Sequence, residues 1–377
     1  MIPFNKPHMT GRELYYIAQA HFNQMLAGDG PFTKRCHAWL EAKTGCRRAL
    51  LTNSCTAALE LSALLLDIQP GDEVILPSFT FVSTANAFAL RGAVPVFVDV
   101  RGDTLNLDER LVEAAITPRT KAIVPVHYAG VACEMDTLLA IAQQHALSVV
   151  EDSAQGVMAC YKGRPLGSLG HLGAYSFHET KNVISGEGGA LLVNDPQYVD
   201  RAEVLREKGT DRSRFFRGEV DKYTWQDIGS SFLPGELIAA FLWAQLEEAE
   251  SVTQGRLRSW QIYHDLLAPL EDQARLRRPI VPAECSHNAH MYYILLPDTP
   301  TRDGLMHELR GRGIYAVFHY VPLHSSPAGR RLGRTPQELP VTDSVAGRLL
   351  RLPLWSGISV DEQATVVSAI ADYLQRA

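Results

Sequence analysis

The chain has 377 residues, of which 46 % are hydrophobic and 21 % are charged, and Lys plus Arg (36) against Asp plus Glu (42) give a net charge of −6. This composition is typical of a globular protein with a sizeable core, and it excludes a disordered chain, a collagen-like chain and a small disulfide-stapled fold. A nucleic-acid partner is not expected, because binding to nucleic acid needs a strong positive field that this composition lacks.

The first residues, the apolar stretches and the cysteines indicate the cellular compartment to expect. Met1–Thr10 has no apolar segment of the kind found in secretory signals, and no stretch approaches the roughly 18 apolar residues that would cross a bilayer. The six cysteines are scattered and do not have zinc-ligand spacing. We therefore expect a cytoplasmic protein with free thiols, no metal site and no membrane partner.

Residues 45–195 alternate between short apolar runs and segments with helical spacing. Leu50–Thr52 leads into a helix whose apolar residues extend from Ala57 to Ile68, and Pro70-Gly71-Asp72 ends it. The strands expected in this region also include Val74–Pro77, Val94–Val100, Ala122–Val126, Ser148–Glu151, Ala174–Phe177 and Ala190–Val193.

Within Ala122–Glu151 a helical stripe from Met135 to Ala142 lies between two strands, which is the pattern of a βαβ unit. Repetition of such units predicts an α/β fold with a doubly wound, mostly parallel sheet. Ligands of such sheets bind beyond the carboxyl ends of the strands.

The alternation of strands and helices ends near residue 250. At about 150 residues per domain, the length of the chain is consistent with two domains. We expect a large α/β domain over residues 1–250 and a small α+β domain over residues 251–377. The elements predicted in the second are a helix over Gln254–Leu270, strands over Met291–Leu296 and Tyr315–Tyr320, and helices over Arg302–Arg312 and from about Asp361 onward.

Reactive side chains follow several of the predicted strands. Asp152 comes directly after one strand, Lys181 follows another, and Cys55 and Thr56 begin a helix. A carboxylate, a lysine and a helix N-terminus at one sheet edge suit a phosphorylated aromatic cofactor held through the lysine amine. Each residue alone also has a structural interpretation: a surface lysine, a loop cap after a strand or an ordinary helix start.

Four stretches then identify a resemblance. The chain resembles the sugar-aminotransferase family of fold-type I pyridoxal-phosphate (PLP) enzymes, the DegT/DnrJ/EryC1/StrS group. The matching stretches are Ser78–Asn86 (SFTFVSTAN), Ala122–Gly130 (AIVPVHYAG), Val150–Gln155 (VEDSAQ) and Ser176–Gly189 (SFHETKNVISGEGG).

The resemblance implies roles for residues of this sequence. Lys181 resembles the lysine that bonds to PLP and moves protons, and Asp152 resembles the partner of the pyridinium nitrogen. The positions that match other PLP contacts are Gln155 (ring hydroxyl), Phe81 (stacking) and Cys55, Thr56 and Ser176 (phosphate). His127, Tyr128, His319 and Tyr320 are candidates for the sugar pocket.

Family members are homodimers with shared active sites, so the resemblance implies a homodimer in which the partner's 206–233 region completes each site. Two positions depart from the family pattern. Many relatives have Gly in place of Cys55, and many supply a phosphate-binding Asn near Leu233. A leucine cannot replace an amide donor, so Ser230 and Ser231 are the candidates for that contact.

The resemblance implies a transaminase that uses L-glutamate and a nucleotide-linked keto-sugar. The similarity is strongest to members that aminate C4 of a dTDP-4-keto-6-deoxyhexose, and it extends over residues 2–7, 28–30, 50–74, 208–231 and 319–324. Their product is dTDP-4-amino-4,6-dideoxygalactose, used in polysaccharide biosynthesis of the enterobacterial common antigen type.

Other functions remain open. They are transamination of another nucleotide-linked sugar, such as a GDP-linked, perosamine-type one, and a non-catalytic PLP-binding regulatory protein. A desulfurase is disfavoured, because Cys55 or Cys160 would need to lie on a mobile loop, whereas Cys55 falls at a helix start. A sugar dehydratase is disfavoured by Lys181, because the resemblance implies histidine there in dehydratases.

Overall fold

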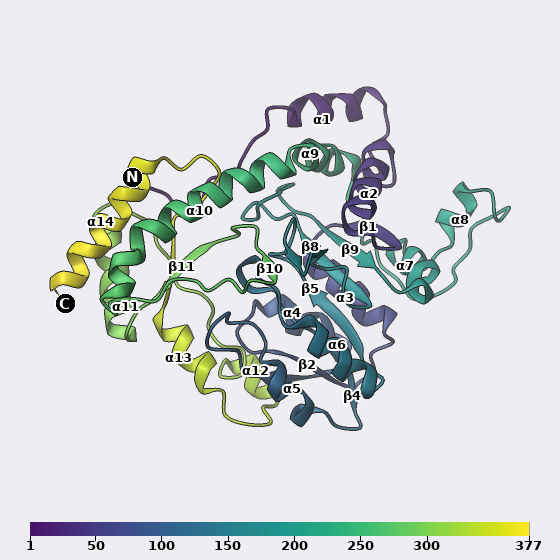
Figure 1. Cartoon of the computed structure of the whole chain (residues 1–377). Helices are drawn as coiled ribbons and strands as arrows, with labels where there is room; N and C mark the ends of the chain where they lie inside the picture. Colours follow the sequence, from purple (N-terminus) through teal and green to yellow (C-terminus); the bar gives the residue numbers. More distant parts are fainter. Residues whose placement is uncertain (377) are drawn as a thin grey trace.

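A computed structural model describes residues 1–376. Its centre is a seven-stranded sheet in the order β1-β9-β8-β5-β4-β2-β3, flanked by helices on both faces (Figure 1). The strands are β1 (Arg48–Thr52), β2 (Glu73–Pro77), β3 (Val94–Val98), β4 (Thr120–Ile123), β5 (Ser148–Asp152), β8 (Leu172–Ser176) and β9 (Gly189–Val193).

The pairings between β3, β2, β4, β5 and β8 are all parallel. Burial on both faces explains why these strands read as continuous apolar runs rather than as alternating ones. Strand β9 differs, because it runs antiparallel to both β1 and β8. The expected α/β fold with a mostly parallel sheet is confirmed, with β9 as the exception to parallel pairing.

Helices cover the sheet on both faces. One face packs against α3 (Cys55–Leu65), α4 (Val82–Ala89) and α7 (Val199–Arg206), and the other against α5 (Glu109–Ala115) and α6 (Met135–Gln144). Beside β1 a third cluster joins α1 (Glu13–Phe22), α2 (Pro31–Thr44) and α9 (Glu236–Glu247). The short elements here are η1 (Tyr128–Gly130), β6 (Cys160–Tyr161), β7 (Arg164–Pro165), η2 (Pro196–Tyr198) and α8 (Arg212–Phe216).

The chain after α9 forms a second core. The long helix α10 (Ala249–Asp272) packs with α14 (Val360–Arg376) and with the two-stranded sheet of β11 (Tyr292–Leu295) and β12 (Leu349–Leu352). The remaining elements are β10 (Cys285–Ser286), α11 (Thr299–Gly311), α12 (Pro327–Leu332) and α13 (Pro340–Arg348).

The first residues lie in this second core and not in the first. Ile2 is buried in it and bridges to Ile314, and the carbonyl of Phe4 accepts a hydrogen bond from the backbone N–H of Leu354 (3.2 Å). Accordingly the N-terminus lies beside α14 (Figure 1). Residues 2–4 therefore contact elements that lie beyond the boundary expected at residue 250.

The strand expected over Tyr315–Tyr320 does not form. Only Val317 bridges to β12, at Arg351, after which the chain turns away. The rings of His319 and Tyr320 pack against Phe79 instead of extending along the sheet. Among the described residues, no helix has both the length and the apolar content needed to cross a membrane.

Candidate active site

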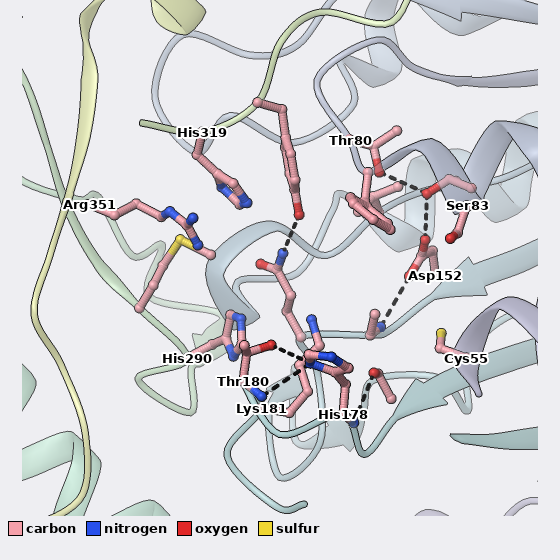
Figure 2. A pocket seen from close by; sticks show the side chains of 18 of the residues that line it. Cys55, Thr80, Ser83, Asp152, His178, Thr180, Lys181, His290, His319 and Arg351 are labelled. Carbon is pink, nitrogen blue, oxygen red and sulfur yellow. Dashed lines mark hydrogen bonds between the residues drawn. The ribbon is translucent and has the colours of Figure 1, made fainter. Parts of the chain in front are cut away.

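A cavity of about 790 Å³ opens at the carboxyl ends of the central strands, where a doubly wound sheet binds its ligands. Strand β5 brings Asp152 to it and β8 brings Ser176, while Lys181 lies on the loop that follows β8. The N-terminus of α3 forms a further wall with Cys55 and Thr56. Figure 2 shows Asp152, Lys181 and Cys55 around one open space.

Lys181 is partly buried in the cavity wall, and its backbone N–H donates to the carbonyl of His178 (2.9 Å) in a tight turn. Burial lowers the pKa of the Lys181 amine, and the positive charge of Arg351 lowers it further, while the negative charge of Asp152 opposes this. A lowered pKa raises the fraction of neutral amine at neutral pH. A neutral amine is the form that attacks a carbonyl carbon.

Asp152 is 5 % exposed and has its two oxygens held by separate donors. Thr84 Oγ1 donates to Asp152 Oδ2 (2.7 Å), and the backbone N–H of Ala154 donates to Oδ1 (3.1 Å). The Thr84 hydroxyl uses its one hydrogen in the bond to the carboxylate. In the hydrogen bond between Thr80 and Thr84 (2.8 Å) the donor is therefore the Thr80 hydroxyl. This chain of hydroxyls fixes the carboxylate toward the cavity (Figure 2).

The start of α3 can bind an anion. Ser54 caps the helix by accepting from the backbone N–H of Ala57 (3.0 Å), and the first turn contains Cys55 and Thr56. Helix N-termini carry free N–H groups and a partial positive charge that favour a phosphate group. Burial raises the pKa of the Cys55 thiol well above its usual value, so the thiol adds no negative charge there.

Gly189 lets strand β9 pass directly beneath this helix start. A Cβ atom at Gly189 would lie 2.4 Å from the backbone of Ser54 and Cys55. The Thr56 hydroxyl donates to Ser83 Oγ (2.8 Å), and Ser176 also lines the cavity. The hydroxyls and N–H groups here fit the phosphate of PLP.

Phe81 and Gln155 form the part of the wall that a flat ring would contact. Phe81 is 58 % exposed although its ring is apolar, and it lies 6.4 Å from the ring of Tyr320. Gln155 accepts from the backbone N–H of Ala129 (2.6 Å) and donates to the Tyr320 hydroxyl (3.1 Å). Phe81, Gln155, Asp152 and Lys181 therefore surround one space, and this donor set fits a pyridine ring with a hydroxyl and an aldehyde.

The four sugar-pocket candidates are placed differently. His319 and Tyr320 line the cavity, but His127 and Tyr128 do not. His127 is fully buried; it accepts from the backbone N–H of Cys133 (3.1 Å) and so donates through Nε2 to Glu151 (2.9 Å). His127 directly follows the strand expected over Ala122–Val126, but β4 ends at Ile123 and the His127 ring is buried in the core.

Tyr128 lies one layer behind the cavity wall. It is 1 % exposed, and its hydroxyl lies 2.9 Å from Nδ1 of His319. Tyr128 therefore supports a cavity-lining residue and has no surface of its own in the pocket.

The 206–233 region does not line the cavity of its own chain. Its helix α8 projects from the body of the molecule (Figure 1), and Ser230 and Ser231 are exposed. The base of this segment adjoins the start of α3, because the backbone N–H of Asn53 donates to the carbonyl of Phe232 (2.8 Å).

Three basic residues of the wall were not predicted. His290, Arg256 and Arg351 come from the second core, and isolated basic residues near apolar strands give no sequence signal for a site. Asn182 Nδ2 donates to the carbonyl of Asn288 (2.7 Å), so Asn182 Oδ1 faces His290 Nδ1 (3.2 Å) as an acceptor. His290 thus carries its proton on Nδ1, and burial holds its pKa well below the usual value.

A model of the DegT/DnrJ/EryC1/StrS aminotransferase family matches residues 7–371. The spore coat polysaccharide biosynthesis protein SpsC of Bacillus subtilis (strain 168) is 33 % identical over 100 % of this chain and 98 % of its own length. GDP-perosamine synthase of Caulobacter vibrioides is 34 % identical over 98 % of this chain and 97 % of its own.

A solved structure adds the cofactor. The PLP-form of Spr1654 from Streptococcus pneumoniae superimposes with a TM-score of 0.91 at 26 % identity, covering 100 % of this chain and 99 % of that one. The cavity residues described above fit the same cofactor, and the sheet matches the fold-type I architecture. The chain belongs to the DegT/DnrJ/EryC1/StrS aminotransferase family and is a PLP-dependent sugar aminotransferase.

Proposed function

We propose that this enzyme transfers the amino group of L-glutamate to C4 of dTDP-4-keto-6-deoxyglucose, giving dTDP-4-amino-4,6-dideoxygalactose for polysaccharide biosynthesis. The observation that carries the transaminase chemistry is the meeting of Lys181, Asp152 and the start of α3 at one cavity. The choice of the dTDP-linked sugar is supported by the resemblance of residues 2–7, 50–74, 208–231 and 319–324.

Each residue of the site has a role in this proposal. Asp152 would hold the pyridine nitrogen, Phe81 the ring face, and Cys55, Thr56 and Ser176 the phosphate. PLP supplies an electron sink that makes a carbon beside the bound nitrogen acidic. Lys181 Nζ would then move a proton at the Cα of the donor and at C4 of the sugar, since the lowered pKa of its amine suits it to accept protons near neutral pH.

A GDP-linked keto-sugar is the second candidate substrate. One observation favours it: the relative that is 34 % identical is named GDP-perosamine synthase. Both candidates present a keto group at C4 to Lys181. They differ away from that carbon, in the nucleotide that anchors the sugar and in the configuration of the hexose at C2. Remote binding of this kind orients the reacting atoms.

A homodimer with shared active sites is part of the proposal. The segment from α8 to β-bridge residue Ser231 exposes Phe216 (68 %), Trp225 (79 %) and Ile228 (46 %). Apolar side chains gathered on a projecting segment mark an interaction surface. A second copy of this chain is the proposed occupant, and its Ser230 or Ser231 would reach the phosphate. Light scattering should give the mass of a dimer, and a mass of one chain would contradict this.

The test of the substrate uses the purified holoenzyme. Addition of L-glutamate should bleach the visible absorption band of bound PLP, and dTDP-4-keto-6-deoxyglucose should then restore it with formation of an aminated product. GDP-4-keto-6-deoxymannose is the matched competitor. Turnover of the GDP-linked sugar alone would contradict the dTDP assignment, and a band that glutamate leaves unchanged would contradict glutamate as the donor.

Lys181→Ala tests the chemistry itself. The variant should remain folded, lose the visible band and lose transamination, because no other amine at the cavity can replace Nζ. Lys34→Ala, which removes an exposed amine on α2, is the control and should keep full activity. Transamination by Lys181→Ala at the rate of the wild-type enzyme would refute the role of this lysine.

A further inference from the structure

Asn288 lies where the second core meets the loops of the cavity. It is 1 % exposed, lies between β10 and β11, and does not line the cavity itself. Its Nδ2 donates to the backbone carbonyls of Gln155 (2.8 Å) and Val157 (2.7 Å), and its Oδ1 accepts from the backbone N–H of His290 (3.0 Å). Both N–H groups and the oxygen of this amide are therefore in use, which fixes its orientation.

The backbone carbonyl of Asn288 holds a second loop. It accepts a hydrogen bond from Asn182 Nδ2 (2.7 Å), and Asn182 is the buried residue that directly follows Lys181. The oxygen of the same Asn182 amide accepts from His290 Nδ1 (3.2 Å). Both ends of the Asn182 side chain are thus bonded to the segment that contains Asn288.

This segment joins two loops that have no direct bond to each other. Within the described chain, no hydrogen bond connects residues 154–157, in the loop after β5, with residues 178–186, in the loop after β8. The first loop contains Gln155 and the second contains Lys181. Residues 288–290 are therefore the hydrogen-bonded link between them.

Gly130 makes room for the Asn288 side chain. A Cβ atom at Gly130 would overlap Asn288 Oδ1 and would lie 3.1 Å from the carbonyl oxygen of Gln155. Its neighbour Ala129 donates from its backbone N–H to the side chain of Gln155 (2.6 Å). The backbone and the side chain of Gln155 are thus held by separate partners, and Asn288 holds the backbone.

The backbone of the linking segment is strained. Ala289 has φ +52°, in the left-handed region that residues with a Cβ atom rarely adopt. Arg256 of the long helix α10 holds it there, because Nε donates to the carbonyl of Ala289 (3.0 Å) and Nη2 to that of His290 (2.7 Å). Strain that the surroundings maintain beside a cavity is typical of a segment whose exact position matters for function.

PLP needs Gln155 and Lys181 at neighbouring points of its ring. The ring hydroxyl, which Gln155 is expected to contact, is attached to the carbon next to the one that carries the aldehyde. The aldehyde is the group with which the Lys181 amine reacts. Groups that act on adjacent ring substituents must be held to within about 0.5 Å, so their two loops need a common support.

We propose that Asn288 is a positioning residue for the cofactor. Through its amide and its carbonyl it sets the spacing between the Gln155 side chain, which contacts the ring hydroxyl, and the Lys181 amine, which bonds to PLP. Asn288 itself touches neither cofactor nor substrate. The inference rests on the proposed function only through these two roles at PLP, and it does not depend on which keto-sugar is aminated.

The pH dependence of the visible band of the holoenzyme tests the Gln155 side of this support. Gln155 Nε2 uses one N–H on Tyr320 and has the other for the ring oxygen. A hydrogen bond to that oxygen favours its deprotonated form, so losing the bond should raise the pH midpoint of the band by about half to one unit. Asn288→Ala and Gln155→Ala should both show this rise. The double variant should shift no further than Gln155→Ala alone, because Asn288 acts through Gln155.

Binding of PLP to the apoprotein tests the Lys181 side. Asn182→Ala removes the bond to the carbonyl of Asn288 but leaves the two bonds from the Asn288 side chain. After mixing with PLP, this variant should form the visible band about 3- to 10-fold more slowly, because its amine is less well placed. Its pH midpoint should equal that of the wild type.

Asn194 provides the matched control. Its Nδ2 also donates to two backbone carbonyls, those of Gly167 and Gly170 (both 2.9 Å), and it does not line the cavity. Asn194→Ala and Asn288→Ala should both lower Tm of the apoprotein, but only Asn288→Ala should move the midpoint of the band. A shift in neither variant, or the same shift in both, would show that Asn288 acts only on stability and would overturn the assignment.

A double variant whose shift is the sum of the two single shifts would also overturn it. If Asn288→Ala does not fold, Asn182→Ala decides alone: slower band formation supports the assignment, and a wild-type rate contradicts it. Failure of the proposed function looks different. An enzyme with the expected midpoints and rates that does not aminate the dTDP-linked sugar would contradict that function alone.

Discussion

Thr84 is a positioning residue, because it acts on bound PLP only through Asp152. Its hydroxyl donates to Asp152 Oδ2 at 2.7 Å and is fully buried, and it accepts from Thr80. Thr84→Val keeps the shape of the side chain but removes this donor. A hydrogen bond to a charged group contributes about 1.5–3 kcal/mol. Since each 1.36 kcal/mol changes a rate tenfold, kcat should fall about 10- to 100-fold.

The assay compares kcat and KM for glutamate across three variants of the holoenzyme. Thr84→Ser retains the hydroxyl and should recover most of kcat, and Thr80→Val leaves the bond from Thr84 to Asp152 intact and should cost less than about threefold. KM should change little in all three, because the side chains of Thr80 and Thr84 are buried at the edge of the cavity and leave almost no surface for the amino acid to contact. A Thr84→Val enzyme with wild-type kcat, or equal losses in Thr84→Val and Thr84→Ser, would refute the reasoning.

Three further predictions concern cofactor binding and stability. Phe81→Ala should raise the dissociation constant of PLP about 3- to 10-fold in equilibrium dialysis, as expected for loss of a stacking contact, while Phe81→Tyr should not; equal affinities would contradict a stacking role. Glu151 is fully buried and accepts hydrogen bonds from His127 and from the backbone N–H groups of Gly167, Leu169 and Gly170. Glu151→Gln should therefore lower the free energy of unfolding by about 3 kcal/mol and Tm by about 4 °C. An unchanged Tm would show that these hydrogen bonds make no net contribution to stability. Glu73 pairs with Arg334 and Arg119, which lower the pKa of its carboxyl to about 2. A depressed carboxyl pKa stabilises the fold above the unfolded value near 4.5, so Glu73→Gln should lose about 3 kcal/mol at pH 7. That difference should vanish in unfolding titrations as the pH falls from 4.5 to 2, and a difference independent of pH would contradict the ion-pair origin.

Much of the site could be anticipated because its residues follow strands. Asp152 is the last residue of β5 and Cys55 is the first residue of a helix, and apolar spacing reveals both of these local features. The direction of a strand could not be predicted in this way. The run Gly189–Val193 is as apolar as the parallel strands, and its residues do not indicate that it pairs antiparallel. Direction depends on how the connecting loop returns, which is a property of the whole sheet.

Contacts between distant segments could not be predicted. Thr84 meets Asp152 across 68 positions of the sequence, and Arg351 reaches the cavity from a two-stranded sheet in the second core. His127 shows the converse error, because a strand-end position predicts an edge but not the side on which the ring packs. Hydrogen bonds to Glu151 and to the backbone N–H of Cys133 hold the imidazole of His127 in the core and turn it away from the cavity.

The pairing of Ile2 with Ile314 and of Phe4 with Leu354 joins the parts of the chain that a ribosome makes first and nearly last. At about 5–20 residues per second, the amino-terminal segment waits roughly 20 to 70 seconds for those partners to emerge. During that interval Phe4 and Asn5, which line the cavity, lack the residues of the second core that line it with them. The growing chain can therefore form the part of the cavity at the start of α3 early, but it completes the wall that the second core provides only when synthesis is almost finished.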